Sequence, residues 1–256
     1  MSVIDLNLLS GDDSGITAAD HSFVSLNEDR ISAIPDSMNR STVPKRNIVA
    51  RGFAVVQKRL IPRTALIQAG RNSDVKQVKT LLDLNIDTQI KDKYGVTVLY
   101  YAAENGYEAV VRLLLDKGAD VNARGGYHGN ALQAASLKGH EAVVRLLLDK
   151  GADVNARGGD YGNALQAASV YGHEAVVRLL LDKGADVNER GGGYGNALQA
   201  ASVYGHEAAV RLLLDKGADV NARGGYHGNA LQAASVYGHE AVVRLLLDKG
   251  AVYRRG

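Results

Sequence analysis

The chain repeats itself every 33 residues, as a series of regularly spaced glycines shows: Gly106, Gly139, Gly172, Gly205 and Gly238. The segment HEAVVRLLLDKGADVN that follows Gly139 returns almost unchanged after the next two of these glycines. A sequence built from short copied units predicts a linear array in which each unit packs on its neighbours. Such an array is typical of proteins that hold partners, so the pattern indicates binding without identifying the partner.

The composition excludes several kinds of activity. The chain has no cysteine, and therefore no disulfide, thiolate metal ligand or thiol nucleophile. The first residues, MSVIDLNLLSGDDSG, lack a basic start, and no segment approaches the ~20 apolar residues of a membrane helix, so we expect neither a secretory signal nor membrane insertion. A net charge of +2, with no repeated basic stripe, argues against nucleic-acid binding. We expect a cytoplasmic protein, and two basic pairs, Lys45-Arg46 and Lys58-Arg59, leave a nuclear location open.

The chain divides into an irregular first part and a repetitive second part. Residues 1–58 are rich in Asp, Ser and Asn and predict a mostly disordered segment. Residues 59–91 follow the period with added polar residues, as expected of a capping unit, and full units follow at 92–124, 125–157, 158–190, 191–223 and 224–256. The last unit keeps the interior sequence AVVRLLLDKGA, so it is expected to be uncapped, which leaves truncation, fraying, cover by a partner or oligomerisation through this end open.

Local signals place two short helices in each unit. In the unit 125–157, Asn130 is a good N-cap for ALQAASLK, which ends at Gly139. The second helix, EAVVRLLLDK, carries Val and Leu at helical spacing and ends at Gly151. The segment ADVNARGGYHGN between helices is rich in turn formers and predicts an extended, hairpin-like finger. Neither helix can cover its own apolar face, so the units must bury one another.

The unit that starts at Asp92, DKYGVTVLYYAAENGYEAVVRLLLDKGADVN, resembles the ankyrin repeat in its length and in its glycine, Ala-Ala and Leu-Leu positions. The resemblance covers about residues 64–256 and implies an all-α ankyrin-repeat solenoid, with a helix-turn-helix and a finger in each unit. In later copies the family's Thr-Pro-Leu-His becomes Asn130-Ala131-Leu132-Gln133, which removes a rigid start and a local hydrogen-bond partner. We therefore expect the finger to be looser than in family members that keep the proline and histidine. The near identity of the copies also resembles arrays in fungal signalling and self-recognition proteins.

No residue pattern predicts catalysis, a metal site or a cofactor. The recurrent histidines, His140, His173, His206 and His239, stand one repeat apart, so they cannot converge on one metal ion. They occupy the family's structural Gly-His position, and we interpret them as structural. The resemblance therefore implies a protein that is not an enzyme.

The near-identical copies differ at two places in each unit, and these are the candidate contacts with a partner. One is the finger, which varies as Tyr127, Asp160, Gly193, Tyr226 and, at the next position, as His128, Tyr161, Tyr194, His227. The other is the end of the first helix, which varies as Lys138, Tyr171, Tyr204, Tyr237. In the ankyrin family both places face the concave recognition surface, and tyrosine is favoured at binding hot spots. All of these residues except Asp160 and Gly193 are our predicted partner-binding residues, and the alternative is that the tyrosines only pack between units.

Two functions remain after these exclusions. The leading hypothesis is a non-enzymatic protein-interaction scaffold that binds a protein or peptide on a concave, tyrosine-rich face. The alternative is the targeting or sensing array of a larger enzyme, such as a signalling NTPase or a ligase subunit, whose catalytic region lies outside this chain.

Overall fold

The computed structural model describes residues 63–253, and within them every regular element is a helix. In chain order the helices are α2 (Arg63–Arg71), α3 (Val75–Asp83), α4 (Val98–Glu104), α5 (Glu108–Asp116), α6 (Ala131–Leu137), α7 (Glu141–Asp149), α8 (Ala164–Val170), α9 (Glu174–Asp182), α10 (Ala197–Val203), α11 (Glu207–Asp215), α12 (Ala230–Val236) and α13 (Glu240–Asp248). The expected all-α solenoid is confirmed. The chain separates into one unit up to Ile61 and a second from Pro62, and the predicted disorder of 1–58 lies outside the described residues.

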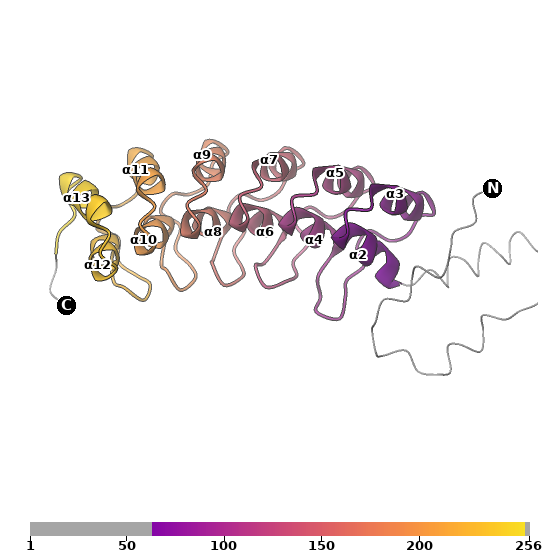
Figure 1. Ribbon diagram of the computed structural model, residues 1–256, viewed down its shortest axis with the longest axis horizontal. Coiled ribbons are helices and arrows are strands. Elements are labelled where there is room, and N and C mark those ends of the chain that lie inside the picture. The colour runs from indigo at the N-terminus through magenta and orange to yellow at the C-terminus, as the bar shows by residue number, and fades with distance from the viewer. Residues whose placement is uncertain (1–62, 254–256) are drawn as a thin grey trace, which may run out of the picture. The chain divides into compact units, whose positions relative to one another are not determined.

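The helices form two parallel rows (Figure 1). The even-numbered helices make the inner row, the odd-numbered helices make the outer row, and the fingers extend beyond the inner row. Each helix packs on its partner in the same repeat and on the equivalent helix of the next repeat. The core is therefore a continuous layer between the rows, and its largest fully buried side chains are one leucine or two from each repeat, such as Leu132 and Leu147.

The inner helices begin and end where the sequence predicts. The Asn130 side chain accepts a hydrogen bond from the Gln133 backbone N–H at 2.9 Å, and the Gln133 Oε1 accepts one from the Asn130 backbone N–H, which completes a capping box. After the helix, Gly139 takes a φ of 74°, which is a left-handed conformation that favours glycine.

The recurrent histidines join one repeat to the previous one, as the structural interpretation expects. His173 Nε2 donates a hydrogen bond to the Leu137 carbonyl at the end of the preceding inner helix, at 3.0 Å. Its ring lies against Gly139, where an added Cβ would be only 2.6 Å from Nδ1. The same bond recurs at the other histidines of the series: His140, His206 and His239. Each histidine therefore satisfies a carbonyl that the helix leaves without a partner.

A buried glutamine supplies the finger with the hydrogen-bond partner that we expected to be lost. Gln133 Nε2 donates to the carbonyls of Ala156, Gly158 and Gly162, at 3.0 to 3.4 Å, all in the finger of the following repeat. Gln166 and Gln199 repeat this arrangement one and two units later. Glutamine, in the position of the family's histidine, thus supplies a hydrogen-bond partner by reaching forward to the next finger, and the expected looseness of the finger stays a prediction.

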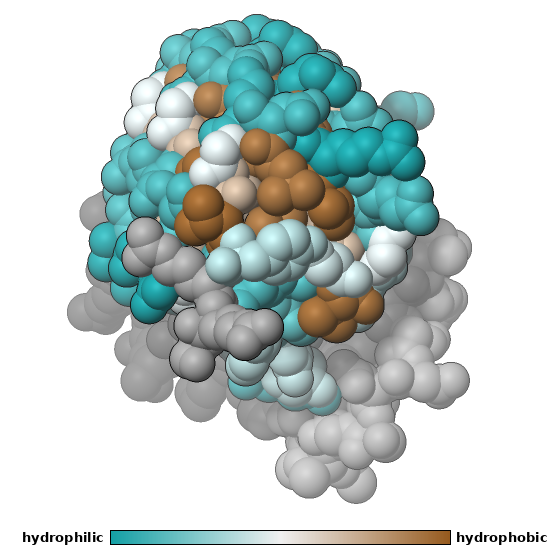
Figure 2. All heavy atoms as spheres, turned by 90° about the vertical axis from the view of Figure 1, so that its left-hand side faces the viewer, coloured by the Kyte–Doolittle hydropathy of each residue, from teal (hydrophilic) through white to brown (hydrophobic). Residues whose placement is uncertain are grey.

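The end of the unit formed by α12 and α13 carries exposed apolar side chains (Figure 2). Val236 is 71% exposed, whereas its counterpart Val203, one repeat earlier, is only 5% exposed. Leu247 and Val252 are also exposed at this end. The sequence of the last described repeat is that of an interior repeat, so its apolar residues lie where a following unit would cover them.

Candidate partner-binding face

The fingers of adjacent repeats approach each other so closely that glycine is required between them. Within several fingers an isolated antiparallel bridge joins the two arms, for example between Gly158 and Gly162. A Cβ added to Gly159 would lie only 2.4 Å from the backbone carbon of His128 in the preceding finger. The Gly-Gly pair that replaces the family's usual residues therefore brings successive fingers into backbone contact.

Each of four successive fingers carries one aromatic ring at the positions we call the finger aromatics: His128, Tyr161, Tyr194 and His227. The close approach of the fingers stacks the first three of these rings. The ring centroids of His128 and Tyr161 are 5.7 Å apart, and those of Tyr161 and Tyr194 are 6.5 Å apart with planes within 5° of parallel. The stack extends towards the amino terminus, where the buried Tyr100 ring lies 6.5 Å from His128.

A second set of rings, the helix-end tyrosines Tyr171, Tyr204 and Tyr237, stands beside the finger aromatics. They are the C-cap residues of α8, α10 and α12, and they are 51%, 46% and 51% exposed. The Tyr204 hydroxyl lies 2.6 Å from that of Tyr194, and the Tyr171 hydroxyl lies 3.2 Å from that of Tyr161. The structure thus brings the two predicted sets together, and it leaves about half of each helix-end ring open to a partner.

Tyrosine hydroxyls are protonated at neutral pH, and burial raises the pKa of two of them further, at Tyr161 and Tyr194. Loss of solvent raises the pKa of the Tyr194 hydroxyl, and its hydrogen bond with Tyr204 raises it further. The pKa of Tyr161 is raised for the same reasons, with Tyr171 as the partner. At neutral pH these hydroxyls are therefore neutral groups that can both donate and accept hydrogen bonds.

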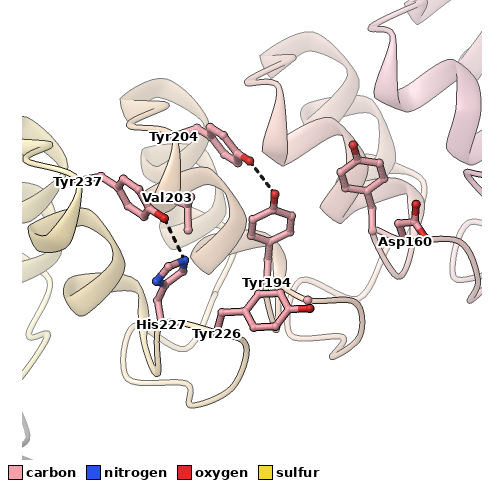
Figure 3. A pocket seen from close by; sticks show the side chains of 9 residues that line it. Asp160, Tyr194, Val203, Tyr204, Tyr226, His227 and Tyr237 are labelled. Atoms are coloured by element: carbon pink, nitrogen blue, oxygen red, sulfur yellow. Dashed lines mark hydrogen bonds between the residues drawn. The ribbon is translucent and has the colours of Figure 1, made fainter.

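Between the fingers and the helix ends lies an open hollow of about 540 Å³ (Figure 3). Its lining includes the finger aromatics Tyr161, Tyr194 and His227, the helix-end tyrosines Tyr204 and Tyr237, and four further residues: Asp160, Gly193, Val203 and Tyr226. The Tyr226 ring lies across Gly193, where an added Cβ would be 2.3 Å from the ring, and the Tyr226 backbone N–H donates to the Gly193 carbonyl at 3.0 Å. The glycine at 193 therefore lets one fingertip ring border the hollow.

Four of the predicted binding residues are not among those that line the hollow: Tyr127, His128, Lys138 and Tyr171. Tyr127 is 84% exposed at its fingertip and makes no ring contact with the described residues. Lys138 is the exposed C-cap of α6, and it occupies the position that tyrosine takes in later repeats. His128 belongs to the stack, but its Nε2 faces Glu104 Oε1 at 3.7 Å instead. Burial lowers the pKa of His128, and the Glu104 carboxylate opposes this shift.

A cluster around Tyr101 at the start of the array was not predicted from the sequence. The Arg71 guanidinium lies 3.8 Å above the Tyr101 ring centroid and 3.2 Å from Asp92 Oδ2, and the Tyr101 hydroxyl donates to the same carboxylate at 2.6 Å. Asp160 was also not among the predicted binding residues, although the variable finger position at which it stands was a usable signal. Tyr101 gave no such signal, because later repeats carry alanine at its position.

Neither a metal-binding cluster nor a membrane-spanning helix is found in the described part of the chain. No group of three or more His, Asp or Glu side chains between residues 63 and 253 is arranged to hold a metal ion. Of the helices described, none combines the length and apolar character needed to cross a bilayer.

Comparison with known proteins agrees with this geometry. The family model of ankyrin repeats (3 copies) matches residues 48–125, 126–191 and 192–255. This chain belongs to the ankyrin repeat family. The crystal structure of the human ASB11 ankyrin repeat domain is similar to it, with 26% identity, 74% of this chain and 85% of that one covered, and a TM-score of 0.68. An ankyrin repeat domain from Acinetobacter baumannii AYE shares 30% identity over 73% of this chain and 98% of that one, with a TM-score of 0.65.

A search of curated proteins gives no match. The two similar structures are human and bacterial, so they do not test the expected likeness to fungal arrays, which stays a prediction.

Proposed function

We propose that this ankyrin array binds a protein or peptide segment on the face formed by its fingers and inner-helix ends, with the helix-end tyrosines as the main contacts. Ankyrin repeats are generally protein-interaction modules. The observation that carries the proposal is the exposure of about half of each helix-end tyrosine beside a hollow of about 540 Å³.

The arrangement of the two ring sets supports this assignment. Three of the finger aromatics, His128, Tyr161 and Tyr194, are partly buried in a stack, so their geometry is maintained before a partner arrives. The helix-end tyrosines rest against them and against the structural histidines, as Tyr204 does on His206 at 6.2 Å. Rings held in place lose little conformational entropy on binding, which favours them as contact residues.

The test uses a phage library of random linear peptides selected on the full chain. Binding of the selected peptides is then measured on a variant that combines Tyr171→Ala, Tyr204→Ala and Tyr237→Ala. Truncation of a buried aromatic anchor costs about 2 kcal/mol, or roughly thirtyfold in affinity, so the triple variant should lose detectable binding. A matched control combines Arg178→Ala, Arg211→Ala and Arg244→Ala, which are exposed outer-helix residues of the same three repeats.

The control should bind within about twofold of the unmodified chain, because it removes surface side chains from the opposite row of helices. Circular dichroism should show both triple variants folded. The proposal fails if the folded tyrosine variant keeps the original affinity for every selected peptide. The alternative, a targeting array of a larger enzyme, stays a prediction that extension of the gene on both sides would test.

A further inference from the structure

The hollow has an unusual balance of charge among its lining residues. Asp160 is the single charged side chain among the nine that line it, and neither lysine nor arginine is among them. Asp160 is exposed at its fingertip. The other polar groups are five tyrosine hydroxyls, the backbone, and the His227 ring, whose Nε2 lies 3.5 Å from the Tyr237 hydroxyl. A ligand that fits this lining offers a positive charge and a flat surface.

Tyrosine rings attract cations over their faces, because the ring quadrupole is negative there. Tyr204 and Tyr237 are about half exposed and Tyr226 is 83% exposed, so all three offer ring surface at the hollow. In the Tyr194–Tyr204 pair one hydroxyl donates its hydrogen to the other. Both oxygens keep lone pairs that can accept a hydrogen bond from an N–H group of a ligand. The lining therefore combines ring faces, neutral acceptors and one carboxylate.

Elsewhere in the chain a tyrosine ring and a carboxylate already hold a cation together. At the other end of the array, the Arg71 guanidinium covers the Tyr101 ring at 3.8 Å and pairs with Asp92 at 3.2 Å. The Tyr101 hydroxyl donates to that carboxylate and completes the cluster. The chemistry of tyrosine, carboxylate and guanidinium is thus satisfied internally near α2, whereas the hollow holds tyrosines and a carboxylate without a guanidinium among its lining residues.

We propose that the hollow receives an arginine side chain of the bound peptide, with its guanidinium on the exposed tyrosine rings and Asp160 as its counter-charge. This inference rests on the proposed function and specifies the chemistry of the partner. Arginine fits better than lysine because its planar group stacks on rings and presents several N–H donors at once. An acidic or phosphorylated side chain would meet Asp160 with no basic residue in the lining to balance it.

The experiment examines the peptides selected on the full chain for enrichment of arginine over lysine and over acidic residues. The tightest arginine peptide is then compared with two synthetic counterparts, in which citrulline or lysine replaces the arginine. Citrulline keeps the shape of the side chain and removes its charge. We expect citrulline to weaken binding about tenfold and lysine to weaken it less.

Asp160→Asn should weaken the arginine peptide several-fold and leave the citrulline peptide unchanged, because the lost interaction is then already absent. Asp248→Asn removes the same charge from an exposed position on α13 and should change neither affinity. Tyr226→Phe keeps the ring and should retain most of the affinity.

Two outcomes separate the two proposals. If the selected peptides depend on the helix-end tyrosines but show no arginine enrichment, or if citrulline binds as well as arginine, the arginine assignment is overturned and the binding face stands. If no selected peptide depends on the helix-end tyrosines, the binding face itself is wrong, and the arginine assignment falls with it.

Discussion

Helices α10 and α12 have the same sequence, ALQAASV, but α10 buries all of it, whereas α12 leaves its carboxyl end exposed. In α10 the last residue, Val203, is 5% exposed, while the same residue of α12, Val236, is 71% exposed. Ser202 is likewise fully buried and Ser235 is exposed. In a solenoid the burial of a residue is thus supplied by the next repeat and does not follow from its own sequence.

The helix-end tyrosines behave differently across the same two repeats. Tyr204 and Tyr237 are 46% and 51% exposed, although one precedes another repeat and the other lies in the last described one. Their surroundings come mainly from their own finger, as the contacts Tyr204–Tyr194 and Tyr237–His227 show. The burial of the inner-helix ends therefore depends on the next repeat, whereas the exposure of the helix-end tyrosines is set largely within each repeat.

The sharpest test of this contrast places a charge on each of the two valines. Val203→Asp buries an unpaired carboxylate between repeats and should cost roughly 3 to 5 kcal/mol in the free energy of unfolding. Val236→Asp leaves its charge in water and should change stability by less than about 1 kcal/mol. Urea unfolding followed by circular dichroism measures both, and equal losses would contradict the contrast.

Substitutions that create a cavity in the core should also destabilise the protein by an amount that depends on the neighbouring repeats, although the loss of stability should be smaller. Leu147→Ala removes a fully buried side chain from the middle of the array and should cost roughly 2 to 5 kcal/mol. Leu246 is equally buried within its own repeat, but fewer repeats depend on it, so Leu246→Ala should lower the melting temperature less. Thermal unfolding of the two variants decides, and equal shifts would argue against coupling between repeats.

The glutamine that links one finger to the next should contribute a moderate amount. Gln166 is fully buried and donates to the carbonyls of Glu189, Gly191 and Gly195, so Gln166→Ala leaves buried acceptors without this partner and should cost about 1 to 3 kcal/mol. Gln89→Ala is the control, because Gln89 makes one exposed bond, to the Gly118 carbonyl at 3.3 Å. The control should cost clearly less in the same urea titration; a cost equal to that of Gln166→Ala would mean that the buried bonds add little.

The smallest effects are expected at the helix-end tyrosines. Tyr204→Ala and Tyr237→Ala each remove a half-exposed ring and should each lower stability by about 1 kcal/mol or less. The two losses should also be similar, unlike those of the valine pair. Differential scanning calorimetry checks this, and a much larger loss for Tyr204→Ala would assign the ring to packing between repeats and not to recognition.

Much of the repeat could be predicted from the sequence because its signals act over short distances. Asn130 as N-cap and Gly139 as helix end depend on hydrogen bonds and backbone angles within a few residues, and the structure has both. The structural role of His173 was also predictable, since copies that stand one repeat apart cannot meet at one ion. The forward reach of Gln133 was not, because its partners lie 23 to 29 residues later in the chain.

By itself, the sequence determined the period, the helices, their ends and the variable positions at which a partner would be read. The tertiary structure decided which of these positions meet: Asp160 and Tyr226 line one hollow, whereas Tyr127, at a similar fingertip, does not. It also decided that the end of one copy of ALQAASV is core while the end of another is surface. The physical reason is that burial and ring stacking depend on how closely consecutive repeats approach. Glycines such as Gly159 and Gly193 allow that close approach, but their effect is visible only when the neighbouring finger is in place.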